Sequence, residues 1–287
     1  MTRSTSHCAY GGLVAVCVGF AILGVALPWA YRSFAFAAYR DAVEHAIGDP
    51  GSAIDRARTL LLGITGGSIA GKWIAHLALV DALIRRRARW AWRASMTGML
   101  MWLVVDSSVS LAHGAWWNVV LINGAVPLLF GALLLRARTG LVEDGPGPHP
   151  DRALRWARLA LLAGAGSGMF IAVCGTTPLF GPWHGPFDAL TADAASRPAA
   201  RALLASVLGP IGGSTLAQFV MLAALVRHAG ARERGRTLAW CAASILTWAV
   251  YDSAWSFAVG AAFNVALVNA PALVLTAAPL AWAAWWR

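Results

Sequence analysis

Long apolar runs alternate with short polar turns from one end of the chain to the other. A run of roughly 18 or more apolar residues is long enough for a helix to cross the hydrocarbon core of a bilayer. The alternation predicts eight membrane-spanning helices, at about residues 11–29, 59–83, 95–112, 115–135, 159–178, 203–226, 237–259 and 262–286. We therefore expect an all-α, polytopic integral membrane protein.

Polar positions inside two of these runs recur at a fixed distance. The stretch 102–123, WLVVDSSVSLAHGAWWNVVLIN, aligns without a gap with 248–269, WAVYDSAWSFAVGAAFNVALVN, 146 residues further on, and 12 of the 22 positions are identical. Chance agreement between apolar segments would match Val, Ala and Leu, whereas here the few polar residues match. They are Asp106/Asp252, Ser107/Ser253, Ser110/Ser256, Asn118/Asn264 and Asn123/Asn269. The pattern indicates an internal duplication.

A second matched pair of stretches, GITGGSIAGKW at 63–73 and GPIGGSTLAQF at 209–219, is rich in small residues. Small residues spaced by four allow two helix backbones to approach closely in lipid. This spacing predicts helix-packing roles for Gly63, Gly67, Gly71, Gly209 and Gly213. An alternative is that each Gly-Gly-Ser breaks its helix at a binding site, as in transporters with discontinuous helices.

The duplication divides the chain into a first four-helix repeat at 1–138, a cytoplasmic linker at 139–156 and a second four-helix repeat at 157–287. Because four is an even number of spans, both repeats enter the membrane from the same side and are parallel, about a pseudo-twofold axis along the membrane normal. Arg clusters follow the second and sixth spans and fill the linker, whereas the turns after the third and seventh spans carry no Lys or Arg. This asymmetry predicts cytoplasmic termini, in a plasma membrane or bacterial inner membrane.

The connector at 31–58 carries apolar residues at helical spacing, opposite charged ones. Phe36, Tyr39, Val43 and Ile47 lie on the apolar side, and the Gly48-Asp49-Pro50 sequence follows. This pattern predicts a short amphipathic helix in the membrane interface that ends at Gly48.

Composition excludes several classes of protein. The chain is 59% hydrophobic and 13% charged, whereas a soluble domain has about a quarter charged residues. Its net charge of +10 resides in Arg clusters beside the spans, so we expect anionic lipid headgroups as partners at the Arg-rich cytoplasmic turns and no nucleic acid. The four Cys form no CxxC pattern, and no disulfide framework, metal or cofactor is predicted.

Ionisable residues within a span are costly, at about 2.5–3.5 kcal/mol each, so each requires a partner or a function. Lys72 and Asp106 fall at similar depths on consecutive spans, which predicts a buried ion pair. In the second copy Asp252 persists but Gln218 replaces Lys72. Asp252 would then have a hydrogen-bonding partner but no cation. We expect it to change protonation near neutral pH and to be the more important of the two acids.

These residues define a predicted substrate or ion pathway. Each Asp lies one helical turn from a Ser, and so shares a face with it. Asn118 and Asn123 are about 140° apart on an α-helix, so one is expected to tie the hairpin together and the other to face a second helix or a cavity. The predicted pathway residues are Asp106, Asp252, Ser110, Ser256, Asn118, Asn264, Asn123, Asn269, Lys72 and Gln218.

Three kinds of function are compatible with this pattern. Intramembrane carboxylates favour a small-solute or ion/proton-coupled secondary transporter or a channel-like protein, with a small molecule or ion as substrate. A membrane-embedded enzyme could use Asp106 and Asp252 as acid and base on a lipid or quinone, but no nucleophile is evident and no catalytic residue is predicted. His76 and His113 differ by ~25 Å in depth and cannot share a haem iron. The third alternative is a scaffold in which Asp, Ser and Asn only bridge helices. Each is compatible with a homo-oligomer.

Overall fold

The computed structural model of the chain describes residues 3–48, 51–143 and 151–285. The described residues form helices joined by short turns, together with one isolated bridge between Ala88 and Val142. The predicted all-α class is confirmed. Part of the predicted linker at 139–156 and the last residue of the eighth predicted span lie outside the described residues.

Seven helical segments among the described residues are long and apolar enough to cross a membrane. They comprise α1 (Arg3–Ala30), α3 (Asp55–Arg86), α4 (Arg89–Ala112), η3 with α5 (Asn118–Asn123 and Ala125–Ala137), α6 (Arg152–Cys174), α8 (Arg197–Arg227), and α10, η6 and α11 (Ala262–Asn264, Val265–Asn269 and Ala270–Trp285). By the length and composition of its helices, the chain is a multi-pass membrane protein.

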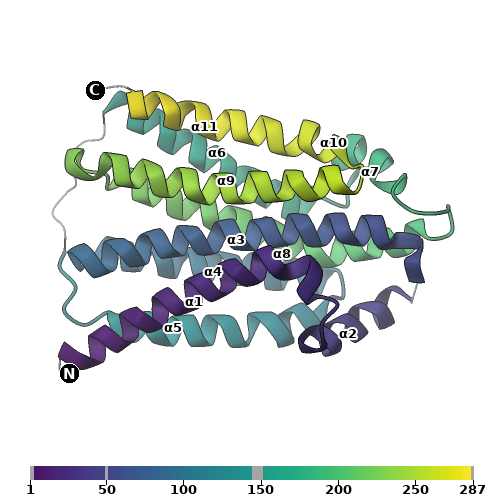
Figure 1. The fold of residues 1–287 in the computed structure, drawn as a ribbon, viewed down its shortest axis with the longest axis horizontal. Helices are drawn as coiled ribbons and strands as arrows, with labels where there is room; N and C mark the ends of the chain where they lie inside the picture. Colours follow the sequence, from purple (N-terminus) through teal and green to yellow (C-terminus); the bar gives the residue numbers. More distant parts are fainter. Residues whose placement is uncertain (1–2, 49–50, 144–150, 286–287) are drawn as a thin grey trace.

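The remaining long helix, α9 (Arg234–Ala258), has 25 residues and corresponds to the seventh predicted span. It is long enough to cross a bilayer, but Trp, Tyr, Ser and Asp residues make its composition less apolar, and it is not among the seven. It nevertheless runs beside α3 along most of its length (Figure 1).

Helices α3 and α8 form the centre of the bundle and are the most deeply buried of the apolar helices. Helix α1 packs on α3, and α6 packs on α8. The helix that follows each central helix in the chain packs mainly on the other central helix. Helix α4, which follows α3, packs mainly on α8, and α9, which follows α8, packs mainly on α3, so that α4 and α9 are exchanged. The long helices of both halves therefore share one interior.

Short helices cover the end of the bundle opposite to the chain termini (Figure 1). On the first half these are η1 (Phe34–Phe36), α2 (Ala37–Ile47) and η2 (Gly51–Ile54), and on the second half η4 (Pro178–Phe180) and α7 (Gly181–Asp188). Helix α2 is the helix predicted in the connector, and it ends at Gly48, whose φ of +65° suits glycine. A last short helix, η5 (Ala231–Glu233), precedes α9.

Ion pairs tie the central helix α3 to α9 at the end of the bundle where α1 begins. Asp81 accepts hydrogen bonds from Arg85 at 2.9 Å and from Arg236 at 2.5 Å. Glu233 accepts hydrogen bonds from Arg85 at 2.9 Å and from Arg86 at 2.6 Å. Much of the Arg cluster predicted at this end is thus neutralised within the protein.

Candidate functional site

The first carboxylate site is built around Asp106 on α4. The Ser110 hydroxyl, one turn further along, donates to Asp106 Oδ1 at 2.9 Å. Asn118 Nδ2 donates to Ser110 Oγ at 3.2 Å and to the Ser206 carbonyl of α8 at 2.8 Å. The Tyr39 hydroxyl of α2 donates to Asn118 Oδ1 at 2.6 Å. A continuous chain of hydrogen bonds therefore links Asp106 to three neighbouring helical segments.

The second carboxylate site, around Asp252 on α9, has the same construction. Asn264 Nδ2 donates to Asp252 Oδ1 at 2.8 Å, and the Ser256 hydroxyl donates to the same oxygen at 3.1 Å. Trp183 Nε1 of α7 donates to Asn264 Oδ1 at 3.1 Å and takes the place that Tyr39 has in the first site. Both Asp side chains are only 1% exposed, so their hydrogen bonds replace water that the site excludes.

The second Asn of each pair also bonds to the helix that carries the Asp. Asn123 Nδ2 donates to Ser107 Oγ at 3.1 Å, and Asn269 Nδ2 donates to Ser253 Oγ at 3.1 Å. The expectation that Asn118 and Asn123 diverge by 140° is wrong, because residues 118–123 form a π-helix. Hydrogen bonds from i to i+5 bring residues five apart towards the same face, so both Asn tie the hairpin to α4. The expectation that one of the two also faces a second helix is met by Asn118, which bonds the Ser206 carbonyl of α8.

Lys72, the only lysine in the chain, is 1% exposed and lines the same cavity as Asp106. Its Nζ lies over the Trp102 ring, 3.4 Å from the centroid, and 5.0 Å from that of Trp73. The ion pairs within 4.0 Å among the described residues do not include Lys72 with Asp106. The predicted direct ion pair is therefore absent, and a cation–π contact holds the ammonium instead.

Gln218 occupies the position in the second half that aligns with Lys72, but its hydrogen-bonding partner is Ser244 and not Asp252. Gln218 Nε2 donates to Ser244 Oγ at 3.0 Å and to the Ser244 carbonyl at 3.3 Å. The Ser244 hydroxyl in turn donates to the Gly71 carbonyl at 2.7 Å, which links α9 to α3. The residue aligned with Ser244 in the first half is Gly98, which has no hydroxyl to offer Lys72.

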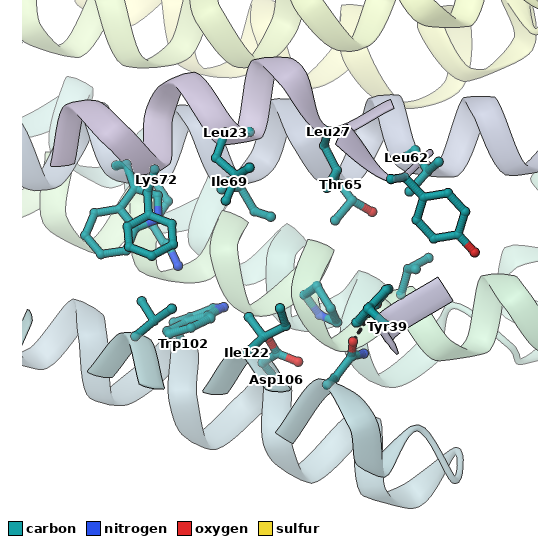
Figure 2. A pocket seen from close by; sticks show the side chains of 18 of the residues that line it. Leu23, Leu27, Tyr39, Leu62, Thr65, Ile69, Lys72, Trp102, Asp106 and Ile122 are labelled. Carbon is teal, nitrogen blue, oxygen red and sulfur yellow. Dashed lines mark hydrogen bonds between the residues drawn. The ribbon is translucent and has the colours of Figure 1, made fainter. Parts of the chain in front are cut away.

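Each Asp lines its own cavity. The Asp106 cavity, of about 110 Å³, is also lined by Lys72 and Tyr39, and is otherwise mainly apolar. Figure 2 shows Lys72 reaching toward Trp102 from one wall and Asp106 on the facing wall. The Asp252 cavity, of about 300 Å³, lies between α3, α6, α8, α9 and α11. Aligned residues line the two cavities: Ile69/Thr215, Trp73/Phe219, Trp102/Trp248, Ile122/Val268 and Val126/Ala272.

The first cavity adjoins a polar vestibule of about 470 Å³ at the end of the bundle that carries α2. Tyr31 and Leu62 line both spaces and so stand between them. The charged residues that line the vestibule are Arg32, Arg40, Glu44, Asp55 and Arg58. A solute that enters from this end would meet the vestibule charges before it reaches Asp106.

The predicted packing glycines lie at close contacts between helices. A Cβ on Gly63 would lie 2.5 Å from the Trp255 Cβ of α9, and one on Gly71 would lie 2.7 Å from Gln218 Nε2 of α8. A Cβ on Gly209 would lie 2.7 Å from the Asp106 carbonyl oxygen, and one on Gly213 would lie 3.2 Å from the Asp106 nitrogen. Helices α3 and α8 continue unbroken through both Gly-Gly-Ser sequences, so these glycines allow close packing and do not unwind the helix.

The glycines of each central helix thus bring the opposite half's acidic helix close: Gly63 and Gly67 face α9, and Gly209 and Gly213 face α4. Among the described residues, no three His, Cys, Asp or Glu side chains are grouped so as to hold a metal ion. His76 instead hydrogen-bonds Ser95 at 2.9 Å and packs on Trp73.

Comparison of the chain with protein-family models, with curated proteins and with solved structures finds no match.

Proposed function

We propose that this protein is a small secondary transporter or channel-like protein that moves a solute or ion through the bilayer by way of Asp106 and Asp252. The observation that carries the proposal is that each buried carboxylate lines a cavity, within a matched cluster of Asp, Ser and Asn. An acid placed only to bridge helices needs no cavity beside it. Intramembrane acids that face a cavity are characteristic of ion and substrate pathways.

We further propose that α9 is an eighth span and that the chain is a duplication of four helices. Three sets of contacts support this: α1 with α3 and α6 with α8, α4 with α8 and α9 with α3, and α5 with α1 and α11 with α6. The π-helical turn that follows α4 and the one that follows α9 support it as well. The exchange of α4 and α9 would then make the two repeats interlocked units.

The Arg-rich end of the bundle is proposed to be cytoplasmic, and the vestibule end to face outward. Anionic lipid headgroups remain the proposed partners at the cytoplasmic turns. Arg85, Arg86 and Arg236 are already paired with Asp81 or Glu233. Lipid contacts would therefore fall to other Arg residues of these turns, such as the exposed Arg232 and Arg227.

The proposal is tested by electrical recording from proteoliposomes adsorbed on a solid support. Rapid jumps of pH, and of small organic cations and anions at constant pH, should produce transient currents that exceed those of protein-free liposomes. The Asp106→Asn, Asp252→Asn double variant keeps the shape of both side chains and removes their charge, so its currents should fall to the protein-free level. Wild-type currents equal to those of empty liposomes for every jump would refute transport.

The scaffold alternative is supported by a specific observation of its own. Gly209 and Gly213 of α8 pack against the backbone of Asp106, and Gly67 of α3 packs against α9 beside Asp252, so both acids lie where helices pack closely. If the acids serve only to hold helices together, Asp252→Asn should lower the unfolding temperature and leave every current unchanged. Loss of current with an unchanged unfolding temperature would exclude the scaffold.

A further inference from the structure

The Asp252 cavity differs from the Asp106 cavity in its charge. Among its lining residues Asp252 alone is charged. In the first cavity Lys72 faces the same space as Asp106 and provides a cation within the protein. The second cavity therefore presents an acid without a counter-charge from its own walls.

The second half provides no such counter-charge because a neutral residue, Gln218, stands at the position that aligns with Lys72. Gln218 is held by Ser244 and is not among the residues that line the cavity. The partners of the Asp252 carboxylate are neutral amides and a hydroxyl: Asn264 and Ser256 both donate to Oδ1, and the Asn269 side chain is a further partner. These neutral groups orient the carboxylate but do not neutralise it.

The remaining lining suits an organic cation. Four aromatic side chains, Phe170, Phe180, Phe219 and Trp248, surround the space, and aromatic faces attract cations. Ser68 also lines the cavity and is fully buried, and its hydroxyl has no hydrogen-bonding partner among the described residues. Buried polar atoms are normally paired, so this hydroxyl is available for a polar atom of a ligand.

The cavity opens toward the apolar outer surface of the bundle. Three of its lining residues, Phe170 of α6, Leu267 of η6 and Leu275 of α11, are 43%, 48% and 45% exposed. In a bilayer this surface faces lipid, because α6 and α11 lie on the outside of the bundle (Figure 1). A ligand would enter from the hydrocarbon and must itself be largely apolar.

We propose that the Asp252 cavity binds a small lipophilic organic cation, an ammonium or pyridinium on an aromatic or aliphatic body, with Asp252 as its counter-ion. The body lies among the four aromatic side chains, and the cavity of about 300 Å³ accommodates a molecule of this size. The inference deepens the proposed function, because it names the ligand class of one carboxylate site, and it rests on that proposal for the placement of Asp252 in the membrane.

The test is equilibrium binding of radiolabelled N-methyl-4-phenylpyridinium to the full-length protein in detergent at pH 8, with no gradient present. The wild type should bind saturably, and 4-phenylpyridine, which is neutral at this pH, should compete at least about tenfold less well. Asp252→Asn should weaken binding by about tenfold or more, whereas Asp252→Glu should retain it. Asp41→Asn, which removes an acid from the exposed side of α2 outside both cavities, is the matched control and should bind like the wild type.

A second variant guards against misfolding of Asp252→Asn. Phe170→Leu removes one aromatic face from a lining residue that is 43% exposed, and should weaken binding of the pyridinium. The inference is overturned if the wild type shows no saturable binding, if the neutral analogue competes equally well, or if Asp41→Asn and Asp252→Asn weaken binding alike. Binding that depends on Asp252, without currents in proteoliposomes, would leave this inference standing and remove the transport proposal.

Discussion

Lys72 Nζ lies 3.4 Å from the centre of the Trp102 ring, and not in an ion pair with Asp106, although both side chains face the same cavity. The ring satisfies the ammonium on one side and leaves the other side open to the cavity. Trp102 belongs to α4, so the contact also ties α4 to α3, two helices that otherwise touch little. The Trp102 ring is therefore the nearer of the two aromatic rings that stabilise this buried lysine.

A double-mutant cycle on this pair should reveal a favourable coupling. The single changes Lys72→Met and Trp102→Leu and their combination should give a coupling free energy of about 1–2 kcal/mol, as for a desolvated cation–π contact. The free energy of unfolding, measured by SDS titration from mixed micelles, provides the readout. Additive effects of the two substitutions would mean that the ring does not hold the ammonium.

A methyl group added at a packing glycine should destabilise the bundle. Gly63→Ala and Gly209→Ala each place a methyl group within 3 Å of an atom on or next to the facing backbone, and should cost about 1–3 kcal/mol of unfolding free energy. Gly166→Ala on α6 is the control, because nothing lies within 4 Å of the added methyl group. The control should be neutral or slightly stabilising, since Ala favours helix over Gly. Equal effects at all three positions would contradict the close contacts.

Acid should loosen the Arg-rich end of the bundle through Glu233. Partial burial pushes the pKa of Glu233 up, but hydrogen bonds and charge from Arg86 and Arg85 outweigh it, so its pKa is lowered from the ordinary value of 4.5. A lowered pKa in the folded state contributes stability that is present above the unfolded value and is lost as pH falls through the folded value. Melting temperatures between neutral pH and about pH 3 should therefore fall less steeply for Glu233→Gln than for the wild type. Parallel curves would show that Glu233 contributes no acid sensitivity.

Cysteine labelling should separate the two ends of the bundle. In a variant whose four native cysteines are replaced, Arg232→Cys should react with a membrane-impermeant maleimide only after the membrane is opened. Ser52→Cys and Ala195→Cys, on the exposed turns of the vestibule end, should react in intact cells. Reaction of Arg232→Cys and Ser52→Cys from the same side would overturn the proposed orientation.

The apolar periodicity predicts the helices well, because the requirement to cross a bilayer imposes long uninterrupted apolar runs. Seven of the eight expected spans meet the length and composition of a membrane helix, and the eighth, α9, is present with a less apolar composition. The connector helix α2 also forms where the spacing of Tyr39 and Val43 predicts it. Each of these features depends on local sequence.

The details of the sites depend on geometry that local spacing does not specify. The π-helical turn brings Asn123 to the face of Asn118, whereas an α-helical count separates them. The Gln218–Ser244 hydrogen bond can be predicted only when it is known which helices pack together. Tyr39 and Trp183, which bond the two Asn carbonyls, come from short helices far away in the sequence and leave no matching pattern there. Trp102 could be singled out from the sequence, because the aligned residue in the second stretch, Trp248, is also a tryptophan.

The exchange of α4 and α9 across the centre of the bundle has a consequence for biogenesis. A polypeptide that stopped before the linker would present the glycine face of α3 to lipid and leave α4 without the surface on which it packs. Each fragment made alone should therefore be degraded, and the two made together in one cell should rescue each other. The protein would reach its mature form only after the last helices leave the ribosome, and its early helices would have to wait in the membrane for partners made later.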